Sequence, residues 1–298
     1  MAPIDLKNEH SRFLLSTLLF LYLVARVLQL FAGRVPSLLI VILHVIPPAL
    51  FAMIHGARVY HSRGILLYAT LCLGVGALFE SVSLRTGFPF GHYRFTNLMG
   101  PKVFDLPILL ALAYLGMGYL SWALGLVILE CQDRPLSGKK IVLLPLAASF
   151  IMTAWDLSMD PVWADIDRAW VWRDGGLYYG VPISNFFGWF LAVYIFYQLF
   201  ALYLRRRVTV PVPTSHWRLA ILFYAASAVG NLLVVAPLSV GGVFVDAAGK
   251  RWMIPEIVWA SRLVSIFVMM PLALIAWVKA ARSVEPARLK KARALGRL

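Results

Sequence analysis

Two aspartates spaced four residues apart are the strongest candidates for chemistry in this sequence of 298 residues. Asp156 and Asp160 lie at the end of an apolar stretch, and on a helix this spacing puts both carboxyl groups on one face. Two close carboxyls in a poorly solvated site do not both ionise easily, so one of them is expected to keep its proton. A neutral carboxyl of this kind is a proton donor. The alternative interpretation is a polar pair at a helix end that faces interfacial water.

A second group of candidates follows an earlier apolar stretch. Glu80 lies late in that stretch, where an unpaired carboxylate is costly in lipid. The following residues 86–93, Thr-Gly-Phe-Pro-Phe-Gly-His-Tyr, have the glycines and proline of a tight, non-helical loop that suits a binding site. His92 and Tyr93 are candidates to relay a proton or to position a water molecule. As an isolated residue, His92 would be an ordinary interfacial histidine.

Aromatic residues are abundant near these acids, among them Tyr178, Tyr179 and Trp189. Many such rings form the aromatic belt that membrane proteins place at the interface. Their π faces also attract cations, and protonating an alkene requires a proton donor together with a surface that tolerates a carbocation. A weaker third group contains Glu256, which is either a site residue or part of the polar contacts between helices.

The elements that position these residues must be membrane helices. The composition is 61% hydrophobic and 14% charged, whereas soluble domains average about 45–50% apolar and about 25% charged residues. One aqueous core cannot hide this much apolar surface, which excludes a soluble nucleotide-binding enzyme and a disordered chain. Cys72 and Cys131 are too few for a disulfide framework and have no metal-binding spacing.

The sequence contains eight apolar stretches, most of them long enough to span a bilayer. Backbone groups cannot stay unpaired in hydrocarbon, so these stretches are expected to be helices. We therefore predict an all-α, polytopic integral membrane bundle of about eight transmembrane helices (seven to nine), with residues 1–298 as a single domain. Pro47 and Pro48 are expected to kink or break the second stretch. The stretches are 13–32, 36–55, 65–84, 106–129, 141–159, 184–204, 217–240 and 256–278.

The distribution of charge predicts the orientation. With eight spans, 18 of the 28 Lys and Arg residues fall on the face that carries both termini, and eight fall on the other. The positive-inside rule makes the first face cytoplasmic, including the basic tail 279–298. We read these charges as contacts with anionic lipid rather than with nucleic acid. Nine of the 14 acidic residues, from separate segments, lie at the opposite face, which is the expected place of the site.

At these residues the chain resembles the integral-membrane carotenoid biosynthesis proteins of the CruF type, the carotenoid 1′,2′-hydratases. The resemblance covers roughly residues 80–190 and is most specific in its second half. The matching residues are Glu80, Thr86, Gly87, Pro89, Phe90, Gly91, Tyr93, Asp156, Asp160, Pro161, Trp170, Trp172, Gly176, Tyr178, Tyr179, Gly180, Pro182, Asn185, Gly188 and Trp189.

The resemblance implies a hydration that needs no cofactor or metal, at the terminal double bond of an acyclic carotenoid or related linear terpenoid. Asp156 or Asp160 would protonate the alkene, aromatic rings would shield the tertiary cation, and water oriented by Glu80 or His92 would capture it. The partners would be a lipophilic polyene, water and the bilayer of a bacterial or archaeal cell. The residues expected to contact the substrate are Phe90, Tyr93, Tyr178, Tyr179, Asn185, Trp189 and Glu256.

Three alternatives remain open from the residues. The same protonation followed by attack of an internal alkene would make a terpene or carotenoid cyclase. The spacing of Asp156 and Asp160 also occurs in membrane prenyltransferases that bind diphosphate through Mg²⁺, although that chemistry requires a second acidic motif and basic residues. A non-catalytic transporter or polyene binder would use intramembrane acids as a path, and its usual sign, an inverted repeat, is not seen here.

Overall fold

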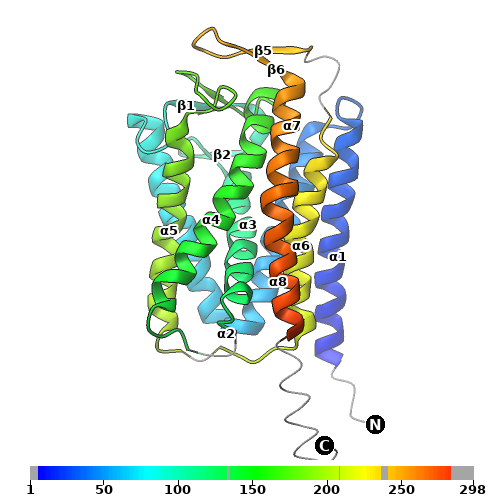
Figure 1. Cartoon of the computed structure of the whole chain (residues 1–298), viewed down its shortest axis with the longest axis vertical. Coiled ribbons are helices and arrows are strands. Elements are labelled where there is room, and N and C mark those ends of the chain that lie inside the picture. Colours follow the sequence, from blue (N-terminus) through cyan, green and yellow to red (C-terminus); the bar gives the residue numbers. More distant parts are fainter. Residues whose placement is uncertain (1–5, 133–134, 208, 236–240, 283–298) are drawn as a thin grey trace, which may run out of the picture.

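The computed structural model describes residues 6–132, 135–207, 209–235 and 241–282. This part of the chain forms a bundle of α-helices that run along its long axis (Figure 1), so the predicted all-α membrane bundle is confirmed. The helices are α1 (Leu6–Leu28), α2 (Ser37–Thr86), α3 (Ile108–Ile128), α4 (Lys140–Pro161), α5 (Ile183–Leu204), α6 (Thr214–Leu232), α7 (Ile254–Val264) and α8 (Met270–Arg282). A π-helical turn, Ser265–Met269, joins α7 to α8, and another, Val162–Ile166, extends α4.

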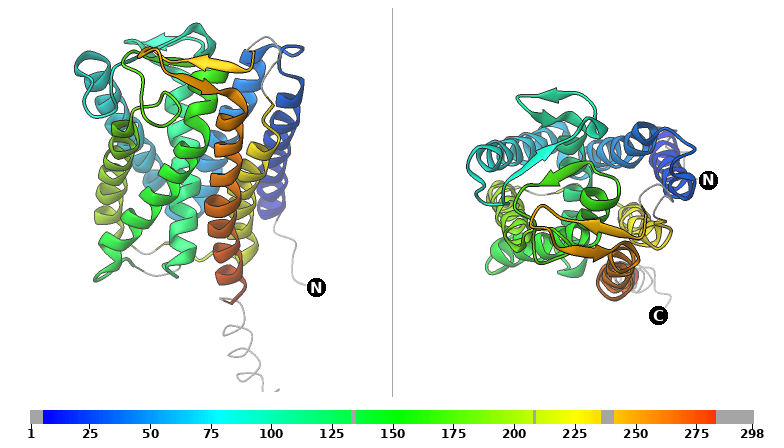
Figure 2. Two further views of the ribbon diagram at one scale, coloured as in Figure 1. Left: turned by 45° about the horizontal axis from the view of Figure 1, so that its top comes forward. Right: turned by 90° about the horizontal axis from the view of Figure 1, so that it is seen from above.

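Short antiparallel strand pairs lie over one end of the bundle, which we call the strand end (Figures 1 and 2). β1 (Tyr93–Phe95) pairs with β4 (Trp170–Trp172), β2 (Lys102–Val103) with β3 (Leu106–Pro107), and β5 (Val243–Val245) with β6 (Arg251–Met253). The pair β1–β4 joins segments far apart in the sequence. It therefore holds the loop after α2 against the loop after α4.

Six helical segments of the described residues are long and apolar enough to cross a membrane, and one of them, α2, has 50 residues. A straight helix of that length would be about 75 Å long, more than twice the ~30 Å hydrocarbon core. Helix α2 bends at His61, the one residue within it that has non-helical dihedral angles. The helix continues through Pro47 and Pro48 without the predicted break, and the bend at His61 lies between the predicted spans 36–55 and 65–84.

The two arms of α2 run in opposite directions between the two ends of the bundle, on either side of the bend at His61. His44 on the first arm packs against Trp163, which follows α4, and Glu80 on the second arm accepts a hydrogen bond from Tyr93 in β1. Both contacts lie at the strand end. Val59, beside the bend, accepts a hydrogen bond of 2.9 Å from the Val210 N–H near the opposite end. Counting α2 as two arms makes seven of these spans, and α6, which runs along the bundle with them (Figure 1), makes eight helical segments in the described part of the chain, within the predicted seven to nine.

We call the end opposite the strands the bend end. Helix α1 starts there and α8 finishes there (Figure 1), which fits an even number of crossings. The predicted basic tail lies outside the described residues from 283 onward, and so do residues 236–240 of the predicted seventh span. That the bend end faces the cytoplasm stays a prediction from the positive-inside rule.

Labelling of single cysteines tests this orientation. Leu177, in the loop between β4 and α5, is 78% exposed at the strand end, and Ser137 is exposed between α3 and α4 at the bend end. A membrane-impermeant maleimide should label Leu177→Cys in intact cells and Ser137→Cys only after lysis. The native Cys72 and Cys131 are buried, so background labelling should be low. The reverse pattern would invert the topology.

Candidate active site

Three carboxyl groups from two helices meet near the strand end. Glu80 lies on the second arm of α2, whereas Asp156 and Asp160 lie on the last turns of α4. Their residues are 5%, 0% and 1% exposed, respectively. Glu80 and Asp160 line one pocket that encloses about 290 Å³, and Asp156 lies directly behind it. The structure therefore brings these three acids together at one end of the bundle, as the sequence predicts.

One amide connects the two aspartates. The Nδ2 atom of Asn185, in the first turn of α5, donates to Oδ2 of Asp160 at 2.6 Å and to Oδ2 of Asp156 at 3.1 Å. The indole N–H groups of Trp170 and Trp172 donate to Oδ1 of Asp160 at 3.0 and 3.4 Å. Asp160 thus accepts three hydrogen bonds. Oδ1 of Asp156 has no hydrogen-bond partner among the residues that the structure describes.

Glu80 is held by two phenols. Tyr114 on α3 donates to Oε1 at 2.8 Å, and Tyr93 on β1 donates to Oε2. Burial, and then the neighbouring Glu80 carboxylate, raise the pKa of the Tyr93 phenol well above its usual value. Tyr93 therefore stays a hydrogen-bond donor across the physiological pH range.

The β1–β4 ribbon explains why these donors point inward. Tyr93 is opposite Trp172 and Phe95 is opposite Trp170 in the antiparallel register. Residues two apart on a strand share a face, so all four rings lie on the same face of the ribbon, which covers the carboxyls. Trp170 and Trp172 are buried whereas Val171 between them is partly exposed.

The rest of the pocket is aromatic and apolar. Trp189 on α5 stacks on Tyr114 with ring centroids 4.2 Å apart, and Phe90 lies 6.5 Å from Trp189. No lysine or arginine lines this pocket, and its donors to the carboxyls are amide, indole and phenol groups. The lining residues are Glu80, Phe90, Tyr93, Phe95, Leu110, Asp160, Trp170, Trp172, Asn185 and Trp189.

Five of the seven residues predicted to bind substrate lie in or beside this pocket: Phe90, Tyr93, Asn185 and Trp189 line it, and Tyr178 is next to it. The Tyr178 hydroxyl donates to the Leu157 carbonyl at 3.2 Å, and burial raises its pKa to about 12.

The other predicted site residues lie elsewhere. Tyr179 packs on Trp252 of β6, with ring centroids 5.4 Å apart. Glu256 is exposed in the first turn of α7. His92 points outward, with its side chain 52% exposed, and its Nδ1 contacts Asp174 at 2.8 Å. His92 follows the Pro-Gly loop directly, but strand alternation turns it to the face of β1 opposite Tyr93.

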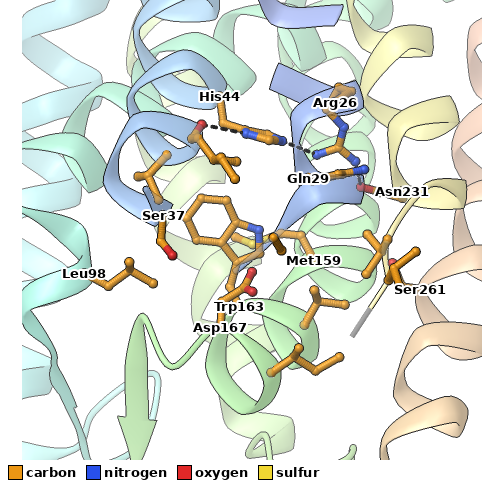
Figure 3. Close-up of a pocket in the computed structure, with 17 residues that line it drawn as sticks. Arg26, Gln29, Ser37, His44, Leu98, Met159, Trp163, Asp167, Asn231 and Ser261 are labelled. Carbon is orange, nitrogen blue, oxygen red and sulfur yellow. Dashed lines mark hydrogen bonds between the residues drawn. The ribbon is translucent and has the colours of Figure 1, made fainter. Parts of the chain in front are cut away.

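Two larger cavities adjoin the site. The first encloses about 530 Å³ and shares Leu110 and Trp170 with the acidic pocket; its other walls include Tyr22, Trp155 and Met117. The second encloses about 760 Å³ between α1, α2, α4 and α6 (Figure 3). These two cavities share five residues, namely Arg26, His44, Met159, Trp163 and Asn231. A route of adjoining cavities therefore leads from the carboxyls to the far side of α4; its first part is mostly apolar, and polar side chains line much of its second part.

Arg26 lies at the far end of this route and is 5% exposed. It donates to Nε2 of His44 at 2.8 Å, to the Ser227 carbonyl at 3.2 Å and to the Asn231 side chain. Nδ1 of His44 contacts the Ile40 carbonyl at 2.8 Å, so it carries the ring proton and Nε2 is the acceptor. Arg26 and Asn231 therefore connect α1, α2 and α6 through polar contacts.

Comparison with known proteins matches this chain to one family. The model of the family described as "Carotenoid biosynthesis protein" matches residues 37–249, which include both arms of α2, the acids and the ribbon. The chain belongs to this family. Its role therefore lies in carotenoid metabolism. No curated protein matches the chain, and no solved structure matches it.

Tyr114 contacts a site carboxyl but is not marked by any sequence pattern, and the lining residues Phe95 and Leu110 are not marked either. Tyr114 lies in the middle of an apolar stretch with no polar neighbours, and only the packing of α3 against α2 brings its hydroxyl to Glu80. Within the described residues, no group of three or more His, Cys, Asp and Glu side chains has the arrangement of a metal site.

Gly188 offers a test of the packing around Phe90. A Cβ atom on Gly188 would lie 2.7 Å from Cδ1 of Phe90 and 3.0 Å from Cγ of Pro89. Alanine is favoured over glycine in helices by about 1 kcal/mol, but overpacking costs about 1–3 kcal/mol. Gly188→Ala should therefore lower the thermal unfolding midpoint in detergent. The matched control is Gly74→Ala on α2, where no atom lies within 4 Å and the midpoint should stay or rise. Equal shifts would contradict the close contact.

Proposed function

We propose that this protein is a hydratase that adds water across the terminal double bond of an acyclic carotenoid. The observation that carries the proposal is the pair Glu80 and Asp160, two buried carboxyls in one aromatic pocket. A reaction that protonates an alkene and captures the cation with water needs an acid, a base and a wall that tolerates positive charge. The pocket has all three.

The adjoining cavities suit the body of a polyene. Ligand pockets are mostly apolar clefts with a few polar groups, and the cavity next to the acidic pocket is lined mainly by apolar and aromatic side chains. Trp155, Trp163 and Met117 provide flat or flexible apolar walls. A linear hydrocarbon would reach them from the bilayer without crossing water, because the bundle itself lies in lipid.

Asp160 is the proposed proton donor because it faces the pocket. Asp156 behind it shares the Asn185 amide, and repulsion between two buried carboxylates keeps at least one of the pair neutral. When Asp160 gives its proton to the less substituted alkene carbon, its new negative charge meets the N–H groups of Trp170, Trp172 and Asn185. Donors already in place for a developing charge lower the barrier.

The opposite wall of the pocket stabilises the cation and activates the water. The π electrons of the double bond form the new C–H bond and leave a tertiary cation, which the faces of Trp189 and Tyr114 stabilise. A water oxygen then bonds to that carbon. Glu80, ionised and oriented by Tyr93 and Tyr114, takes a proton from the attacking water, so the product is a tertiary alcohol. The proton is returned to Asp160 through solvent.

The contacts of the aspartates favour this reaction over prenyl transfer. A diphosphate held through Mg²⁺ needs carboxylates free to bind the metal and cationic side chains near the phosphates. Here the carboxylate oxygens of Asp160 already accept hydrogen bonds from amide and indole N–H groups. Among the described residues, no lysine or arginine lines the pocket.

Replacement of the proposed acid tests the function. In a host that accumulates lycopene, the wild-type protein should convert it to products heavier by the mass of one water per end. Asp160→Asn should lower this conversion by about 100-fold or more, the usual contribution of a general acid, and Asp156→Asn should lower it as well. Conversion is measured by chromatography and mass spectrometry at matched protein levels.

The control is Asp174→Asn, which removes an exposed carboxyl at the same end of the bundle and should keep the wild-type rate. A product with the unchanged mass of the substrate would indicate cyclisation instead. Wild-type conversion by both Asp156→Asn and Asp160→Asn would reject the proposed chemistry.

A further inference from the structure

The hydration proposed above consumes one water in each turnover, and the acids that perform it are almost sealed. Glu80 and Asp160 are 5% and 1% exposed, and the cavity that shares Leu110 and Trp170 with their pocket is mostly apolar. Water and protons therefore need their own way in from the aqueous phase. A route for water and protons into the acidic pocket is needed only if the proposed hydration takes place, so it rests on the proposed function.

A separate pocket lies on the outer side of the β1–β4 ribbon, between the π-helical turn after α4 and strand β5. We call it the outer pocket; it encloses about 480 Å³. Charged side chains line it, including Arg168, which is exposed, and Asp246. Asp246 is already occupied, because its carboxylate accepts hydrogen bonds from two backbone N–H groups and from Trp252. A partly open pocket with charged side chains on its wall can admit water.

Trp172 separates the outer pocket from the acidic pocket, because it lines both. Its indole N–H donates to Oδ1 of Asp160 at 3.4 Å. One side chain therefore lies between the aqueous pocket and the proposed acid.

Asp165 provides a second link between the two pockets. It lines the outer pocket, is 3% exposed, and its Oδ2 atom has no hydrogen-bond partner in the part of the chain that the structure describes. A buried carboxylate oxygen without a donor is costly, and water in the outer pocket would satisfy it. Its carboxyl also lies close enough to Asp160 to interact with it electrostatically.

The π-helical turn explains this proximity. In a regular α-helix, residues five apart differ by about 140° around the axis. From Val162 the helix widens, and the Asp167 N–H bonds to the Val162 carbonyl five residues earlier at 3.0 Å. The wider turn brings Asp165 back toward the face of Asp156 and Asp160. Three carboxyls then follow one another from the buried site to the outer pocket.

We propose that the outer pocket is the water inlet of the active site and that Asp165 passes protons between this water and Asp160. After Asp160 has lost its proton to the alkene, Asp165 gives it a proton through water beside Trp172 and takes another from the outer pocket. Each transfer breaks one O–H bond and forms one O–H bond, and water is the only further reactant. Asp165 acts through Asp160 and is a positioning residue.

The experiment uses the fate of the carbocation in D2O. Membranes that contain the full-length protein are given lycopene, and mass spectrometry measures deuterated alcohol and deuterated, unhydrated polyene. A cation that meets water gives the alcohol, whereas a cation that meets none loses a proton and returns to an alkene that carries deuterium. The ratio of the two products reports water supply independently of the amount of folded protein.

Two variants change the inlet without touching the acidic pocket. Ala247→Trp fills the outer pocket from an exposed position of its lining and should shift the ratio toward deuterated polyene by about tenfold. Asp165→Asn keeps the shape and should lower total deuterium uptake by about tenfold, less than loss of the acid itself. Asp165→Glu should restore uptake. The matched control is Ala248→Trp, the next exposed alanine, which does not line the pocket and should behave as wild type.

The outcomes separate the two proposals. A wild-type ratio in Ala247→Trp together with wild-type uptake in Asp165→Asn would overturn the inlet while leaving the hydratase intact. If Ala247→Trp does not fold, uptake by Asp165→Asn decides alone. A wild-type protein that produces neither alcohol nor deuterated polyene would instead overturn the proposed function.

Discussion

The structure depends on burying carboxyl groups in a lipid-embedded bundle with neutral partners alone. An ionisable side chain inside a membrane is tolerated only when hydrogen bonds replace its water. Here the replacements come from an amide on α5, indoles on β4 and phenols on α3 and β1. Each donor belongs to a different segment, so satisfying the acids requires these segments to meet. The same contacts that make the carboxyls tolerable also fix the loops over the strand end.

The buried cation follows the same rule on the other side of α4. Arg26 donates hydrogen bonds to a histidine nitrogen, a backbone carbonyl and an amide oxygen, all of them neutral, and the nearby Asp167 carboxyl interacts with it electrostatically. An ion pair between Arg26 and the site acids would hold those acids ionised and would remove any proton donor. A mostly apolar cavity separates the cation from the site acids, which suits the proposed acid role of these carboxyls and a hydrocarbon-lined path. A positive charge that develops on a substrate is then favoured at the acidic end of that path.

The bundle and the gathering of its acids are predictable from sequence because both follow from composition and helical spacing. Long apolar stretches must be helices in lipid. Two spans separate the end of the stretch that carries Glu80 from the end of the stretch that carries Asp156 and Asp160, so all three acids are expected at one end of the bundle. Contacts within that end are not predictable in the same way. Tyr114 has no polar neighbour in sequence to mark it, and His92 lies next to site residues but on the other face of its strand. The bend of α2 lies at His61, between the predicted spans 36–55 and 65–84, rather than at the two prolines inside the first of them.

Asp165 shows most directly why regular periodicity is an incomplete guide. With 3.6 residues per turn, residues 156 and 160 share a face and residue 165 does not. The turn that follows Pro161 is π-helical, so the spacing that aligns side chains changes from four residues to five within one helix. Widened turns of this kind recur at functional sites, and here the widening places a third carboxyl at the outer pocket. The feature that would connect a sealed, lipid-embedded site to water is thus a departure from helical regularity.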